Sequence, residues 1–169
     1  MTGGWTGPYL VVCGLLAVAG AAKAWSPDTT ARALRAAGLP SGRRLVRVAG
    51  GLEAIIAVAA LLTGLPVLAG VVAASYLAFS AFIVVALVRG TPISSCGCFG
   101  KPDTPPSRLH VAINLGAAIV ATAVATGPAR SLPRALAHQP LAGLPLLVLA
   151  GAAGYLAYLV FLFPFGGSR

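Results

Sequence analysis

Two of the three cysteines in this chain are separated by a single glycine, in the string Ser95-Cys96-Gly97-Cys98-Phe99-Gly100. Two thiols at this spacing can close into a small strained disulfide, cycle between reduced and oxidised forms, or bind a soft metal. A disulfide far from relaxed geometry is reduced more easily, and easily reduced disulfides are typically catalytic or regulatory. We therefore expect thiol–disulfide redox chemistry at Cys96 and Cys98.

Two polar residues follow this pair, and their spacing places both on one face of a helix. His110 and Asn114 lie four positions apart. A histidine near a thiol can lower the pKa of that thiol or carry its proton, although a histidine at a membrane boundary is often only an interfacial polar residue. Asn114 is more typical of a hydrogen bond between helices. Alternatively, Cys96, Cys98 and His110 supply three ligands to a soft metal, one fewer than structural zinc sites usually have.

Composition identifies the class of protein that must position these residues. Of the 169 residues, 58% are hydrophobic and only 9% are charged. A water-soluble surface cannot be built from so few polar residues, so we expect a multi-pass protein of the cell membrane, in contact with the lipid bilayer. Its spans must be helices, because lipid leaves isolated backbone polar groups unsatisfied. The stretches of suitable length and hydropathy are 8–25, 48–63, 67–88, 108–126 and 141–164.

The predicted fold is an all-α membrane helix bundle. Residues 8–126 form a four-helix core, residues 93–107 form a polar cysteine loop within it, and residues 141–164 add a fifth span. The first stretch lacks the basic start and the cleavage site of a signal peptide, so we expect it to remain as a span. Glycines at 50, 51, 70 and 116 are expected to permit close helix approach.

The segment between the first two spans is basic, and part of it can form a short helix lying on the bilayer. Ser26-Pro27-Asp28 is a typical helix start, and Gly38-Leu39-Pro40 is a typical helix end. The connection over 127–140 is rich in proline and arginine and leads to the fifth apolar stretch. The net charge of +9 needs no nucleic acid as a partner, because basic loops suit anionic lipid headgroups.

Antiparallel spans bring the polar residues to one end of the bundle, on the side of the cysteine loop. Glu53 lies within an apolar helix, where a carboxylate costs about 2.5 to 3.5 kcal/mol and normally finds a partner. Lys23 lies at a depth where it can reach Glu53. The two can form a structural ion pair, or Glu53 can accept protons near the thiols. Cys13 lies about 15 Å deeper than Lys23, and we interpret it as an ordinary buried residue.

The sequence leaves the cofactor and the function class open. A quinone is a possible cofactor, but packing is the first interpretation of the aromatic residues at helical spacing, which are Tyr76, Phe79, Phe82, Tyr155, Tyr158 and Phe161. A scaffold or soft-metal-binding protein without catalysis is the alternative to redox chemistry. A small-molecule transporter is disfavoured by the short chain and by the lack of paired interrupted helices.

Three strings together resemble the methylamine utilisation MauE family, which belongs with the DoxX-like four-helix membrane proteins. They are Ala19-Gly20-Ala21-Ala22-Lys23, Gly50-Gly51-Leu52-Glu53 and Cys96-Gly97-Cys98-Phe99-Gly100. The resemblance covers residues 8–126. It implies a role in maturing an exported, disulfide-rich protein such as a methylamine dehydrogenase subunit, alongside a thioredoxin-like partner. The outline is also similar to vitamin K epoxide reductase, but this chain has no Cys-x-x-Cys and no second loop cysteine pair.

Charge and chemistry favour opposite orientations of the cysteine loop. With five spans, placing this loop in the cytoplasm gathers ten of the twelve lysines and arginines there, as the positive-inside rule favours. Disulfide formation in exported proteins instead requires the loop to face outside. A cytoplasmic loop would indicate a reductant, a thiol sensor or an acceptor of electrons from cytosolic thioredoxin.

Overall fold

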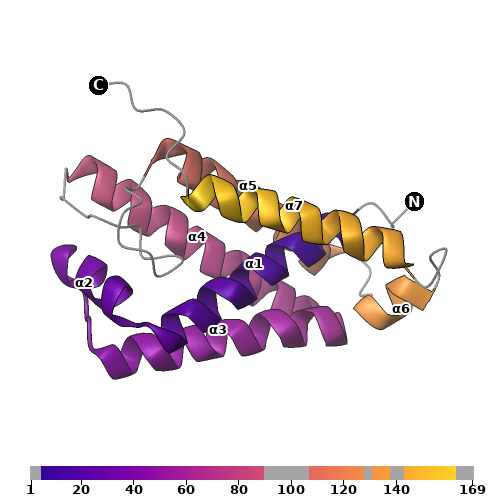
Figure 1. Cartoon of the computed structure of the whole chain (residues 1–169), viewed down its shortest axis with the longest axis horizontal. Coiled ribbons are helices and arrows are strands. Elements are labelled where there is room, and N and C mark those ends of the chain that lie inside the picture. Colours follow the sequence, from indigo (N-terminus) through magenta and orange to yellow (C-terminus); the bar gives the residue numbers. More distant parts are fainter. Residues whose placement is uncertain (1–4, 90–106, 128–130, 138–142, 163–169) are drawn as a thin grey trace.

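The computed structural model describes residues 5–89, 107–127, 131–137 and 143–162. Within these ranges the chain forms helices joined by short turns. The helices are α1 (Thr6–Trp25), α2 (Asp28–Ala36), α3 (Arg43–Thr63), α4 (Pro66–Val88), α5 (Arg108–Thr126), α6 (Leu132–Ala137) and α7 (Leu144–Leu162). Figure 1 shows the long helices side by side, with α2 over one end of the bundle and α6 at the other.

The all-α membrane bundle is confirmed. Four helices, α1, α3, α4 and α5, are long and apolar enough to cross a bilayer. Large apolar side chains point outward from them, including Ile55 at 66% exposure and Val67 at 76%. Such a surface suits lipid tails, which are as apolar as the side chains themselves. The protein is therefore a multi-pass membrane protein.

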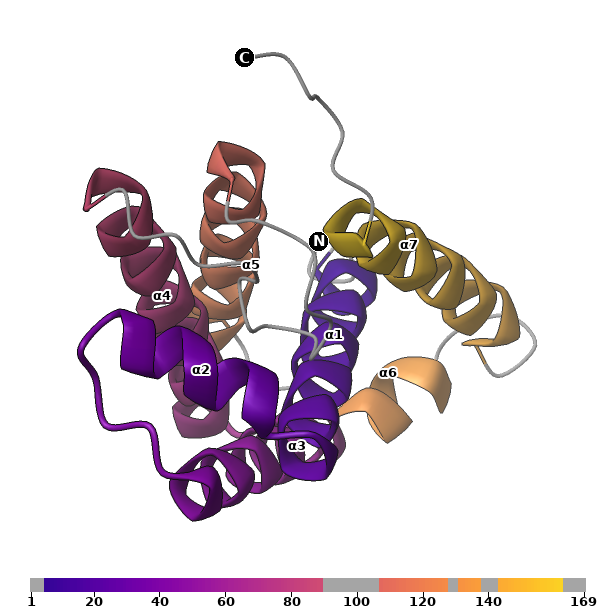
Figure 2. The same ribbon diagram turned by 60° about the vertical axis from the view of Figure 1, so that its left-hand side comes forward.

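The fifth predicted span corresponds to α7, which packs beside α1 at the edge of the bundle (Figure 2). Its described apolar part extends from Leu144 to Leu156. The crossing of the bilayer by α7 stays a prediction, because this part is shorter than the other four spans.

Helix α3 begins at Arg43 and not, as expected, near Val48. Arginine is a good helix former, and its long side chain can reach polar partners from inside a helix. The Arg43 guanidinium contacts both carboxylate oxygens of Asp28, at 2.5 and 2.6 Å, and Arg47 Nε donates to the Ala24 carbonyl at 3.1 Å. The arginines thus extend α3 into the polar end of the bundle and connect it to α1 and α2.

Helix α2 has the predicted ends, and it also packs on the bundle. It begins at Asp28 and is followed by Gly38, whose φ of 73° is a left-handed conformation that favours glycine. Its apolar face does not rest on lipid alone, because Ala33 is buried against Ala86 of α4, with Phe82 packed alongside. Helix α2 is therefore a cover over one end of the bundle, and its position on the bilayer stays a prediction.

The proline- and arginine-rich connection after α5 contains a helix that was not identified from the sequence. Part of it forms the short helix α6, which packs against α3. Leucines at 132 and 136 and alanines at 135 and 137 are good helix formers, which explains the helix despite Pro133 in its first turn.

The core between α1, α3, α4 and α5 is built mainly from small residues. Ala57 and Ala121 are fully buried, as are Cys13 and Val72. Across this core the Tyr76 hydroxyl donates a hydrogen bond of 2.7 Å to the backbone carbonyl of Val12. Small side chains let helix backbones approach closely, which is how packing forces hold helices together where lipid removes the hydrophobic driving force.

Helices α1 and α3 cross with close backbone approach at Gly20 and Gly50. A Cβ on Gly20 would lie 2.5 Å from the Gly50 carbonyl oxygen, and a Cβ on Gly50 would lie 2.6 Å from the Gly20 carbonyl oxygen. The expectation of close approach is thus confirmed at Gly50. It is wrong at 51, 70 and 116, where a Cβ would meet nothing within 4 Å.

This contrast generates a prediction about two neighbouring glycines. Gly50→Ala should lower the free energy of unfolding by about 1–3 kcal/mol, because the new methyl group must push the helices apart. Gly51→Ala should leave stability unchanged or raise it by about 0.5–1 kcal/mol, since alanine is the better helix former. Denaturation of the two purified variants in detergent measures this, and equal stabilities would contradict the crossing.

Candidate functional site: a buried lysine–glutamate pair and its pocket

The predicted contact between Lys23 and Glu53 is present. Lys23 Nζ lies 2.5 Å from Glu53 Oε2, and the two side chains are only 6% and 19% exposed. The glycine crossing explains this proximity, because the Cβ of Lys23 lies just 2.7 Å from where a Cβ on Gly50 would be. Close approach of the α1 and α3 backbones therefore brings a short-range ion pair into an otherwise apolar region.

An aromatic ring completes the environment of the ammonium. Lys23 Nζ lies 4.1 Å from the centroid of the Phe79 ring, a cation–π contact. The Phe79 ring is in turn held edge-on by Tyr76, with centroids 6.1 Å apart and planes at 82°. The sequence did not single out Phe79, because aromatic residues at helical spacing look alike whether they pack in the core or face a charge.

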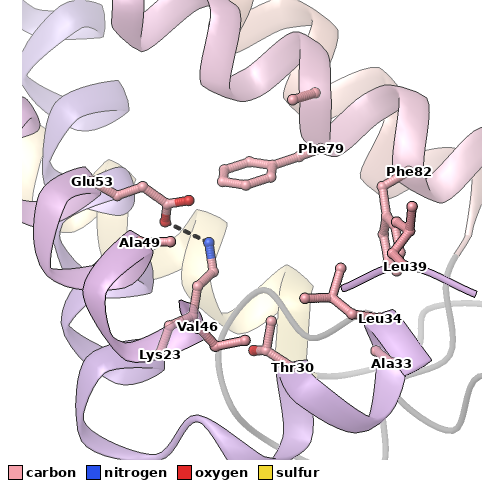
Figure 3. Close-up of a pocket in the computed structure, with 11 residues that line it drawn as sticks. Lys23, Thr30, Ala33, Leu34, Leu39, Val46, Ala49, Glu53, Phe79 and Phe82 are labelled. Atoms are coloured by element: carbon pink, nitrogen blue, oxygen red, sulfur yellow. Dashed lines mark hydrogen bonds and ion pairs between the residues drawn. The ribbon is translucent and has the colours of Figure 1, made fainter. Parts of the chain in front are cut away.

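Lys23, Glu53 and Phe79 lie on the wall of a pocket of about 270 Å³ between α1, α2, α3 and α4 (Figure 3). Apart from the ion pair and one threonine, its lining is apolar. The lining residues are Lys23, Thr30, Ala33, Leu34, Leu39, Val46, Ala49, Glu53, Ala78, Phe79 and Phe82. Helix α2 and the residues after it thus cover a largely apolar pocket, which has the lysine–glutamate pair on one wall.

His110, the predicted proton carrier, is positioned by the start of α5. Ser107 is the N-cap, and its hydroxyl oxygen accepts a hydrogen bond of 3.4 Å from the His110 backbone N–H. In return, the Ser107 backbone N–H donates to His110 Nδ1 at 3.2 Å. This reciprocal capping box fixes the ring and stabilises the helix end. His110 therefore has a structural task whether or not it also moves protons.

Asn114 lies one turn further along α5 and is 3% exposed. Its Nδ2 has no hydrogen-bond partner in the described part of the chain. Neither His110 nor Asn114 lines the pocket of Lys23 and Glu53. The structure thus unites two of the predicted polar residues in one site and places the other two on α5, outside it.

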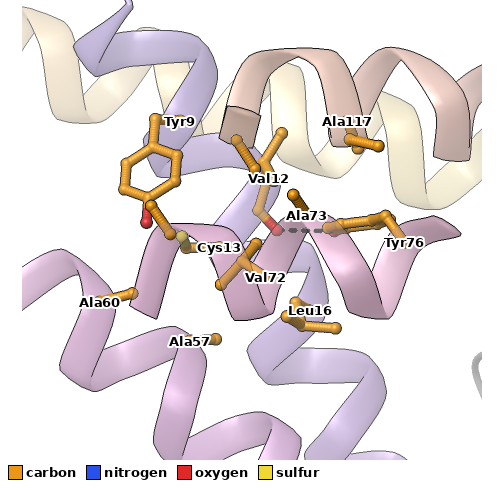
Figure 4. Packing of buried hydrophobic residues seen from close by; sticks show 13 residues of the cluster. Tyr9, Val12, Cys13, Leu16, Ala57, Ala60, Val72, Ala73, Tyr76 and Ala117 are labelled. Carbon is orange, nitrogen blue, oxygen red and sulfur yellow. Dashed lines mark hydrogen bonds between the residues drawn. The ribbon is translucent and has the colours of Figure 1, made fainter. Parts of the chain in front are cut away.

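Of the three cysteines, the structure describes Cys13 alone. Cys13 is fully buried in the core beside Tyr9 (Figure 4), as expected of an ordinary packing residue. Cys96 and Cys98 lie outside the described residues, so of the proposed metal ligands only His110 is placed. Within the described ranges, no three or more His, Cys, Asp or Glu residues come together as a metal site.

Four bilayer-length helices around a buried ion pair define a multi-pass membrane protein of the helical bundle class. A model of the family described as methylamine utilisation protein MauE matches residues 4–127. The chain belongs to the MauE family. It is similar to methylamine utilization protein MauE of Paracoccus denitrificans, with 38% identity over 109 residues. That alignment covers 63% of this chain and 56% of the relative, so the chain spans little more than half of the relative's length. No solved structure matches it.

The geometry of the pair generates a prediction about stability. Lys23→Met should lower the free energy of unfolding by about 3–5 kcal/mol, because it leaves the Glu53 carboxylate buried without its partner. The double variant Lys23→Met/Glu53→Gln should recover much of that loss, since no unpaired charge remains. Denaturant titrations of the purified protein in detergent measure both. The single variant Glu53→Gln completes the cycle, and losses in Lys23→Met and Glu53→Gln that simply add in the double variant would contradict a direct interaction.

Proposed function

We propose that this protein is a membrane thiol–disulfide redox protein that assists disulfide formation in an exported client. The carrying observation is the Cys96-Gly97-Cys98 string in the connection between two neighbouring antiparallel spans. In this proposal the spans hold the thiol pair at the membrane surface, where an exported protein is accessible.

The arrangement of the helices supports this proposal. Helix α4 ends at Val88 and α5 begins at Arg108, and these helices pack against each other. The end of α4 also carries Ala86, which contacts α2, the cover of the pocket. The cysteine loop is therefore attached at the end of the bundle that holds the lysine–glutamate pair.

The proposed chemistry is a pair of thiol–disulfide exchanges. A client thiolate attacks one sulfur of the Cys96–Cys98 disulfide, so that a mixed disulfide forms and the other cysteine leaves as a thiolate. A second client thiolate then attacks the mixed disulfide. The client gains a disulfide, and Cys96 and Cys98 are left reduced with the two electrons. A thioredoxin-like partner is the proposed carrier between this pair and the client.

The family supplies the proposed physiological setting. The Paracoccus relative is named for methylamine utilization. We infer by this kinship that the client of the present chain is an exported, disulfide-containing protein such as a methylamine dehydrogenase subunit. Such a client needs an oxidising compartment, so the proposal places the cysteine loop outside the cytoplasm.

Serine substitutions in the loop test the redox role. Cys96→Ser and Cys98→Ser should each abolish disulfide transfer to a reduced client or thioredoxin-like protein, because neither single thiol can form the intramolecular disulfide. Cys13→Ala is the matched control and should retain transfer, since Cys13 is fully buried in the core. Mass-shift alkylation before and after mixing with the reduced client measures the transfer.

The orientation of the loop gives the same proposal a second test. A membrane-impermeant maleimide should label Cys96 and Cys98 in intact cells only after mild reduction, which would place an oxidised pair outside. Protection in intact cells with labelling after permeabilisation would contradict export maturation. Stoichiometric metal in the purified protein, with thiols that react only after chelation, would favour the metal-binding alternative.

The capping box allows the two roles of His110 to be separated. Glutamine is a regular residue at this capping position, so His110→Gln should keep the hydrogen bonds to Ser107 and the thermal stability of the protein. If the imidazole carries the thiol proton, exchange should slow by about 10² in this variant. Stopped-flow exchange rates as a function of pH, beside unfolding curves, measure both. An unchanged rate and pH profile would leave His110 with the capping role alone.

A further inference from the structure

We propose that the pocket between α1, α2, α3 and α4 binds the ring of a membrane-soluble quinone, with Lys23 donating a hydrogen bond to a carbonyl oxygen. The binding itself stands on the described residues. Its use as the electron acceptor of the Cys96–Cys98 pair rests on the proposed function.

The size and walls of the pocket fit a flat apolar ring. Its volume is about 270 Å³, and its surface is formed almost entirely by hydrocarbon side chains. Two phenyl rings, Phe79 and Phe82, come from one helix and face the chamber (Figure 3). Aromatic walls favour stacked or edge-on contacts with another ring, which add to simple burial of apolar area. Ligand sites of this kind are mainly apolar with a few placed polar groups.

The charges on the wall select a neutral hydrogen-bond acceptor. Lys23 and Glu53 cancel each other, so an anionic ligand would meet the carboxylate and a cationic ligand would meet the ammonium. An ammonium has three N–H donors. One points to Glu53, and the Phe79 ring covers another side of the nitrogen at 4.1 Å. The donor capacity that remains suits an uncharged carbonyl oxygen, which needs a donor and carries no charge into the site.

Two small, exposed residues line the pocket. They are Ala49 of α3 and Ala78 of α4, both on helices long and apolar enough to cross a bilayer. In the proposal the ligand enters sideways from the bilayer between these helices. Small side chains at this entrance leave room for an apolar tail that extends into the acyl chains. A lipophilic ring with carbonyl oxygens and an apolar tail is the chemistry of a quinone.

A quinone also balances the proposed redox cycle. The reduced Cys96–Cys98 dithiol would lose two electrons and two protons as its disulfide forms. The quinone would take up both electrons and both protons and leave as the quinol. The Lys23 ammonium stabilises the negative charge that develops on the carbonyl oxygen during this reduction.

The test measures binding of decylubiquinone to the full-length protein in nanodiscs by titration calorimetry. This quinone is chosen because its fully substituted ring has no position open to thiol addition. Ala78→Phe should weaken binding at least tenfold, because the new ring fills the entrance. Ala74→Phe is the matched control, since this alanine lies one turn away on α4, is also exposed and does not line the pocket; it should bind like the wild type.

A second variant tests the hydrogen bond. Lys23→Met/Glu53→Gln, which leaves no unpaired charge, should also bind at least tenfold more weakly than the wild type. Equal affinity in the wild type and Ala78→Phe, or no binding to a folded wild type, would overturn the pocket assignment. Equal affinity in the double variant would overturn the role of Lys23.

The cysteine variants separate this proposal from the redox proposal. Cys96→Ser/Cys98→Ser should bind decylubiquinone with wild-type affinity, because neither residue lines the described pocket. The wild type, reduced beforehand, should convert bound quinone to quinol, seen in the ultraviolet spectrum, and the cysteine variant should not. Binding without this conversion would overturn the electron transfer, while the quinone site would stand. Disulfide transfer to the client without any quinone binding would overturn the quinone site, while the redox role would stand.

Discussion

The ion pair of Lys23 and Glu53 imposes a constraint that much of this bundle satisfies. Charges inside a membrane-spanning region are tolerated only when they are paired and shielded from lipid. The shielding here needs several elements at once. Gly20 and Gly50 bring α1 and α3 into backbone contact, Phe79 of α4 covers the ammonium, and α2 covers the end of the bundle. The close helix crossing, the position of α4 and the folded-back α2 can each be understood as part of burying one pair of charges.

The helices that bury the ion pair also line the pocket. Lys23 and Glu53 lie on the wall of the same pocket as the phenyl rings of Phe79 and Phe82, which belong to the helix that covers the ammonium. The residues that stabilise the pair are therefore the same residues that would recognise a ligand. The polar groups of the site are held by each other, and Phe79 is packed on Tyr76.

The sequence predicted the features that hydrophobic length and burial cost determine. The spans, the ends of α2 and the contact between Lys23 and Glu53 follow from stretches of apolar residues and from the cost of a lone carboxylate in a helix. It did not predict which glycine faces a neighbouring helix, because Gly50 and Gly51 differ only by a rotation of about 100° around α3. Nor did it identify Phe79 as the cover of the ammonium, since that contact depends on how α4 is rotated against α1. The depth of a residue along its helix can be read from the sequence. The direction in which the residue points around the helix axis can be read only from the packed structure.

The two ion pairs of the described chain differ in how water reaches them. The pair of Lys23 and Glu53 is shielded, whereas the side chains of Arg43 and Asp28, which connect α2 to α3, are 69% and 43% exposed. Because the Arg43–Asp28 pair is exposed to water, its contribution to holding α2 on α3 falls as the salt concentration rises, whereas the buried pair is screened much less. The apolar contact of Ala33 with Ala86 carries no charge to screen. A rise in salt therefore weakens the charged attachment of α2 alone and leaves its apolar attachment and the charged wall of the pocket nearly unchanged.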